Sequence, residues 1–77
     1  MLIQLNQSNA GGRWHLDWQH WNALRNAGWA FENHEYAQKE FGSIEEAIEE
    51  FERLTKFDHD YVPCNCCGRA FSFYELK

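Results

Sequence analysis

Residues 43–56, which read SIEEAIEEFERLTK, contain the strongest secondary-structure signal in this chain of 77 residues. Their apolar side chains recur at the spacing of a helix, at Ile44, Ala47, Ile48, Phe51 and Leu54. Ser43 and Glu46 have the spacing of a capping box, in which each side chain can bond the backbone N–H of the other residue. This pattern predicts an amphipathic helix over residues 44–55 whose apolar stripe faces the core.

The segment before this helix contains a second helix signal and two short strand signals. Alternating apolar and polar residues predict strands at 1–6 and 13–16, which we expect to pair with each other as a hairpin. A helix is expected over residues 18–27, because Asp17 can cap its first turn and Gly28 can adopt the left-handed conformation that ends many helices.

Three more extended segments complete the predicted order of elements. They cover residues 29–31, 35–41 and 70–74. The order strand-strand-helix-strand-strand-helix-strand is typical of an α+β domain. We therefore expect residues 1–77 to form a single domain, in which a small, mainly antiparallel sheet carries two helices on one face.

The composition favours a protein partner over a nucleic acid or a membrane. The chain has twelve acidic residues against seven lysines and arginines, which gives a net charge of −5. Phosphate backbones attract cations, so a general nucleic-acid binder is expected to have a basic face, and this sequence has no basic cluster. An acidic chain of this kind can instead associate with a basic surface on another protein.

The sequence also predicts the cellular compartment. Residues 1–6 lack the basic start and the long apolar run of a signal peptide, and no apolar run approaches membrane-spanning length. Three cysteines cannot all pair with one another, and Cys66 and Cys67 are neighbours with poor geometry for a disulfide. We therefore expect a cytoplasmic protein with reduced thiols and no membrane segment.

All three cysteines fall within residues 64–68, which read CNCCG. Cys64 and Cys67 have the spacing at which two thiolates reach one metal ion from a tight turn, and His59 and Cys66 are candidates for the further ligands. Thiolate and imidazole ligands suit Zn²⁺. The alternative is three reduced thiols in a turn, with Cys66 or Cys67 buried as a small apolar side chain.

This cysteine segment resembles the metal-binding knuckle of zinc-ribbon and rubredoxin-like sites, in which Cys-x-x-Cys-Gly is followed by a small or basic residue. The resemblance covers residues 64–69 alone, and it implies a zinc ion that staples the C-terminal segment. A thiol redox role is a further alternative. Redox Cys-x-x-Cys pairs usually lie at a helix N-terminus, whereas the residues after Gly68 are typical of a strand.

Two groups of side chains are the candidates for contact with a partner. The acidic group lies on the predicted second helix and the aromatic group lies around the first: Glu45, Glu46, Glu49 and Glu50, with Trp14, Trp18 and Trp21. Carboxylates on one helix face can dock on a basic groove, and tryptophan is enriched at interface hot spots. The alternatives are a solvated face for the glutamates and core packing for the tryptophans.

In its small size, acidity and lack of a catalytic motif, the chain is similar to small phage-encoded accessory proteins, a likeness carried by residues 41–47 and 64–68. Many such proteins inhibit a host defence or a host enzyme by occupying a surface. The resemblance implies a non-enzymatic protein-interaction module, such as an inhibitor of anti-CRISPR or other anti-defence type. The alternatives are a zinc-stabilised module that binds nucleic acid through exposed aromatics, and a thiol redox protein.

The cysteine pattern leads to a prediction about metal content. Purified, reduced protein is expected to contain up to one zinc ion per chain, and Cys64→Ser is expected to release it, because the loss of one thiolate opens a four-ligand site. Metal analysis under non-chelating conditions measures the stoichiometry for both proteins. A parent protein without zinc contradicts the prediction.

Overall fold

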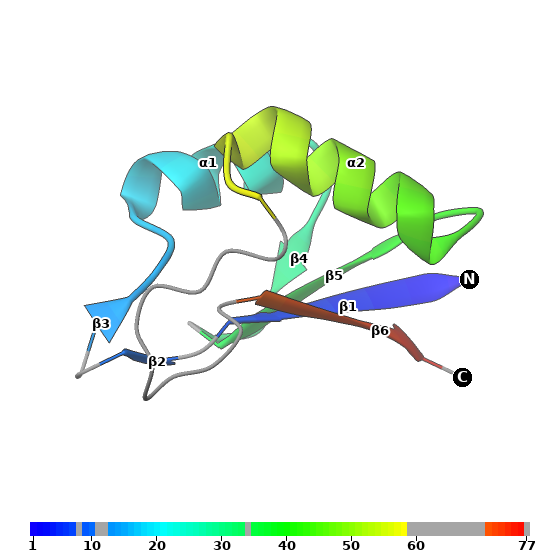
Figure 1. Cartoon of the computed structure of the whole chain (residues 1–77), viewed down its shortest axis with the longest axis horizontal. Helices are drawn as coiled ribbons and strands as arrows, with labels where there is room; N and C mark the ends of the chain where they lie inside the picture. Colours follow the sequence, from blue (N-terminus) through cyan, green and yellow to red (C-terminus); the bar gives the residue numbers. More distant parts are fainter. Residues whose placement is uncertain (8, 11–12, 34, 59–70, 77) are drawn as a thin grey trace.

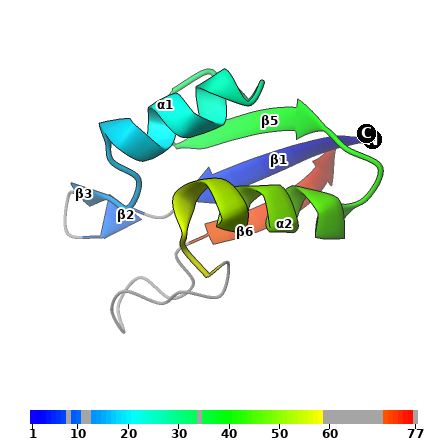
Figure 2. The same ribbon diagram turned by 90° about the horizontal axis from the view of Figure 1, so that it is seen from above.

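The computed structural model in Figure 1 describes residues 1–7, 9–10, 13–33, 35–58 and 71–76. The elements follow one another as β1 (Leu2–Gln7), β2 (Asn9–Ala10), β3 (Arg13–Trp14), α1 (Trp18–Asn26), β4 (Ala30–Phe31), β5 (Tyr36–Glu40), α2 (Ile44–Thr55) and β6 (Phe71–Leu76). Both helices lie on the same face of the main sheet (Figure 1). Seen from above, α1 and α2 lie side by side over the sheet (Figure 2).

Four of the described strands form one antiparallel sheet in the order β4-β5-β1-β6. Leu5 in the central strand β1 lies opposite Ala37 of β5 and Phe73 of β6. Apart from the short β2–β3 hairpin, the order β1-α1-β4-β5-α2-β6 is the split βαβ topology of ferredoxin-like domains. The predicted α+β fold, with two helices on one face of a small antiparallel sheet, is confirmed.

The strand pairing predicted near the N-terminus is wrong. The pattern predicts a hairpin between residues 1–6 and 13–16, but β3 pairs with β2 in a separate two-stranded sheet. Both sides of β1 are instead taken by β5 and β6, which come from distant parts of the chain. Ile3 and Leu5 of β1 are fully buried, and a central position beneath the helices removes more of their surface from water than a local hairpin can.

Helix α1 begins at Trp18 as predicted and ends at Asn26, one residue before the predicted end. The Asp17 carboxylate accepts the backbone N–H of His20 at 3.1 Å, and the backbone N–H of Asp17 donates to His20 Nδ1 at 3.2 Å, which completes a capping box. Gly28 follows the helix with φ at +105°, and the N–H of Trp29 donates back to the Leu24 carbonyl at 3.0 Å. This reversal places Leu24 and Trp29 together in the core.

Helix α2 covers the predicted residues, although its capping box is only half formed. The Ser43 hydroxyl accepts the N–H of Glu46 at 3.3 Å, as expected. The Glu46 carboxylate, however, accepts the N–H of Gly42 at 2.9 Å rather than that of Ser43. The Glu46 side chain is thus bonded to the loop before the helix, and it helps to hold the connection from β5 to α2.

The core lies between the helices and the sheet. Its buried apolar residues come from every layer: Ile3, Leu5, Leu16, Leu24, Trp29, Ala37, Ala47, Phe51 and Phe71. Phe51 is at the centre of the aromatic packing, with its ring centroid 4.8 Å from that of Phe71 and 5.4 Å from that of Phe73. Ile48, which the helical pattern also assigns to the apolar stripe, is only half-buried and lies outside this core cluster.

Substitutions in the stripe of α2 should therefore have unequal effects. Phe51→Asp is expected to abolish cooperative unfolding at room temperature, because a buried, unpaired carboxylate costs several kcal/mol in a domain whose total stability is about 5–15 kcal/mol. Ile48→Asp is the matched control, and it should retain a cooperative melt because the new carboxylate can reach water. Thermal melts followed by circular dichroism measure both, and a Phe51→Asp melt like that of the parent contradicts the assignment of the core.

Candidate functional site

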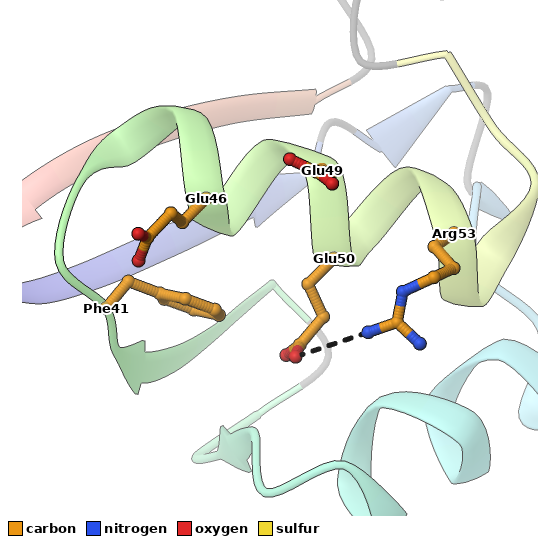
Figure 3. Close-up of a pocket in the computed structure, with 5 residues that line it drawn as sticks. All are labelled: Phe41, Glu46, Glu49, Glu50 and Arg53. Atoms are coloured by element: carbon orange, nitrogen blue, oxygen red, sulfur yellow. Dashed lines mark ion pairs between the residues drawn. The ribbon is translucent and has the colours of Figure 1, made fainter.

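A pocket of about 270 Å³ lies beside α2, where the chain leaves β5. It is lined by Phe41, Glu46, Glu49, Glu50 and Arg53 (Figure 3). The last four come from successive turns of α2, so the helical repeat brings them to one side of the helix. Figure 3 shows Glu46, Glu50 and Arg53 along the side of α2 that is nearest to the Phe41 ring.

Glu50 is the best-connected side chain of this pocket. Its Oε2 atom accepts from Lys39 Nζ at 2.8 Å and from Trp29 Nε1 at 2.9 Å. Lys39 Nζ also donates to the Ala27 carbonyl at 2.7 Å, and Arg53 lies 3.6 Å from Glu50 Oε1. Through these contacts, Glu50 links α2 to β5 and to the end of α1. Its side chain is only 17% exposed, whereas the sequence predicts a solvated position for it.

The other predicted partner-binding glutamates remain at the surface. Glu45, Glu46 and Glu49 are all exposed, although the Glu46 carboxylate is occupied by the Gly42 N–H. Within the residues that the structure describes, neither Glu45 nor Glu49 forms an ion pair. The two carboxylates are one helical turn apart and are available to a partner.

The pocket wall already binds one cation of the chain itself. Lys39 Nζ lies 5.2 Å from the centroid of the Phe41 ring while it pairs with Glu50. An aromatic face together with a carboxylate is a favourable environment for an ammonium or guanidinium group. The carboxylates of Glu46 and Glu49 line the same pocket, together with the exposed guanidinium of Arg53.

The three tryptophans predicted for partner contact have different environments. Trp18 is 71% exposed, whereas Trp14 and Trp21 are half-buried. Trp21 Nε1 donates to the Leu16 carbonyl at 2.9 Å, and its ring packs 4.4 Å from that of Phe31. The structure thus brings Trp18 and Trp21 to one surface, where they help to line a second pocket.

The second pocket, of about 320 Å³, lies on α1 and is lined by Leu16, Trp18, Trp21, Asn22 and Arg25. Sequence reasoning missed Asn22 and Arg25, although Trp18, Asn22 and Arg25 follow one another at the i, i+4, i+7 spacing of a helix face. It also missed the Lys39–Glu50 pair. The sequence did contain a signal for this pair. Lys39 lies two residues after the apolar Ala37 in the same strand, so the two side chains share the face that lies toward the helices.

The face of the sheet opposite the helices has a polar character. Tyr36 donates its hydroxyl to Glu32 Oε2 at 3.0 Å, and this hydrogen bond together with the charge of Glu32 raises the pKa of Tyr36. Gln4 lies between Gln38 of β5 and Tyr74 of β6, which is 51% exposed. The exposed ring of Tyr74 therefore lies directly across from a polar residue, Gln4.

The predicted metal ligands Cys64, Cys66, Cys67 and His59 lie outside the described residues. Within the described ranges, no group of three or more His, Cys, Asp or Glu side chains is placed to hold a metal ion. The helices α1 and α2, which belong to the described part of the chain, are too short and too polar to cross a membrane.

The connections of Glu50 lead to a prediction about stability. Glu50→Ala is expected to lower the free energy of unfolding by about 2 kcal/mol, because it removes two hydrogen bonds and the ion pair with Arg53, and it leaves the half-buried Lys39 without its counter-charge. Glu49→Ala is the matched control on the same helix, and its effect should stay within about 0.5 kcal/mol. Urea unfolding followed by tryptophan fluorescence measures both, and equal losses contradict the assigned role of Glu50.

Comparison of the chain with protein-family models, with curated protein sequences and with solved structures finds no match. What the chain binds must therefore be inferred from its own surfaces.

Proposed function

We propose that this chain is a non-enzymatic protein-interaction module that binds a basic surface of a partner protein through the exposed side of α2. The observation that carries the proposal is the pocket in which the Phe41 ring lies beside the exposed carboxylates of Glu46 and Glu49. This combination recognises a lysine or arginine side chain, since the ring attracts the cation and a carboxylate accepts its N–H groups.

The charge of the whole chain supports this direction of binding. A net charge of −5 on 77 residues attracts a basic partner at long range and raises the rate of encounter. Glu45, which is exposed and lies outside the pocket, adds a further carboxylate to α2 beside those of Glu46 and Glu49. A helix face with charges at this spacing can occupy a groove that otherwise binds the phosphates of a nucleic acid.

Within this proposal, the partner is a host enzyme or a host defence complex with such a basic groove, and the chain inhibits it in the cytoplasm by occupying that groove. This is the manner of action of anti-CRISPR and other anti-defence inhibitors. The proposal needs no reacting group on the chain, because the inhibition follows from covering the surface.

The charges of α2 should control the rate of association more than the lifetime of the complex. Glu45→Gln/Glu49→Gln keeps the shape of the helix, and it is expected to slow association about fivefold at low salt, with a smaller loss at high salt. Binding is measured by surface plasmon resonance with the partner that a pull-down from the native host captures and mass spectrometry identifies.

Glu35→Gln/Glu75→Gln is the control, because it removes the same charge from exposed side chains outside α2. If the control slows association as much as the α2 variant, net charge rather than the α2 surface is responsible and the proposal fails. Circular dichroism melts confirm that both variants fold.

A further inference from the structure

The most exposed large apolar side chain of the described residues is Trp18, at the start of α1. It is 71% exposed, against 51% for Tyr74 and 46% for Met1. Because an indole is a large, rigid apolar group, a tryptophan left in water is a common anchor of protein interfaces. Trp18 is not part of the core. The indole ring of Trp29 is buried in the core, and that of Trp21 packs against the core.

Trp18 borders a pocket whose inner wall is held in place. Leu16 is buried, and its carbonyl accepts the Trp21 Nε1–H at 2.9 Å. The Trp21 ring also packs against Phe31 at a centroid distance of 4.4 Å. These contacts preorganise an apolar wall beside the Trp18 indole, so an apolar side chain can enter the pocket without rearranging the core.

The polar side of this pocket is cationic, in contrast to the surface of α2. Arg25 is exposed at the pocket, with its guanidinium carbon 5.9 Å from the centroid of Phe31. No carboxylate of the described segments forms an ion pair with Arg25, and residues 18–26 contain no aspartate or glutamate. The amide of Asn22 adds hydrogen-bond donors beside the guanidinium.

We infer that this surface of α1 is a second docking site, which takes an apolar side chain flanked by a carboxylate on a protein partner. The indoles of Trp18 and Trp21 hold the apolar group, and Arg25 pairs with the carboxylate, which it can bind through two N–H groups. Charge complementarity selects this occupant, because Arg25 is the charged side chain among the described residues that line the pocket. The inference goes beyond the proposed function, because it concerns a different helix and an acidic rather than a basic partner segment.

The test uses random peptides displayed on phage and selected against the immobilised full chain. Enriched peptides are expected to share an apolar residue next to Asp or Glu, and a synthetic copy should shift the Trp18 indole N–H resonance in spectra of the ¹⁵N-labelled chain. Trp18→Ala is expected to weaken this peptide about thirtyfold, and Arg25→Gln about five- to tenfold. Because both side chains are exposed, both variants should melt like the parent.

Other outcomes overturn the inference in distinguishable ways. Enriched peptides that are basic, or binding that Trp18→Ala leaves unchanged, exclude this pocket as a site for acidic segments. Binding of a single-stranded oligonucleotide that Trp18→Ala abolishes assigns the surface to nucleic acid instead. A concentration-dependent dimer that Trp18→Ala disrupts assigns it to a second copy of the chain.

The Glu45→Gln/Glu49→Gln variant separates this inference from the proposed function. It should bind the selected acidic peptide as the parent does, because Glu45 and Glu49 lie on α2 and do not line the α1 pocket. Loss of peptide binding in this variant contradicts an independent site on α1.

Discussion

Lys39 faces the helices, and the fold has to satisfy its charge there. Lys39 lies opposite Ile3 in the antiparallel ladder, and Ile3 is fully buried beneath the helical layer. An ammonium group on the inner face of a sheet is costly unless it is paired and hydrogen-bonded. Glu50 supplies the counter-charge at 2.8 Å, and the Ala27 carbonyl accepts a second hydrogen bond at 2.7 Å.

The Lys39–Glu50 pair and the apolar stripe of α2 favour the same rotation of the helix on the sheet. With Glu50 directed toward Lys39, the helical repeat places Ala47 and Phe51 in the core and leaves Glu45 and Glu49 in water. The same rotation sets the Phe41 ring beside the acidic side of α2 and so creates the pocket there. The acidic surface therefore follows from the orientation in which α2 both buries its apolar stripe and pairs Glu50 with Lys39.

The two helices consequently present surfaces of opposite charge on the same layer of the molecule. Helix α2 presents carboxylates beside an aromatic ring, whereas α1 presents two indoles beside a guanidinium. In both cases a rigid aromatic side chain provides contact area and a charged neighbour provides selectivity. Under the two proposals made above, these surfaces contact two different segments of a partner, or two partners.

The sequence by itself determined the features that depend on neighbours within one or two helical turns. The bounds of α2, the Asp17 cap and the reversal at Gly28 are of this kind, since each rests on hydrogen bonds between residues two to five positions apart. The order of strands and helices also follows from local periodicity, and with it the α+β class.

Only the tertiary structure decided which strands pair and which charged and aromatic side chains stay in water. The central place of β1, between two strands from the later part of the chain, excludes the local hairpin that its sequence suggests. In the sequence, nothing distinguishes Glu50 from the neighbouring glutamates. Its buried position depends on contacts with Trp29, 21 residues away, and with Lys39, 11 residues away. Trp18 and Trp21 differ for the same reason, because packing against Phe31 buries one indole and leaves the other exposed, and local spacing does not encode such long-range contacts.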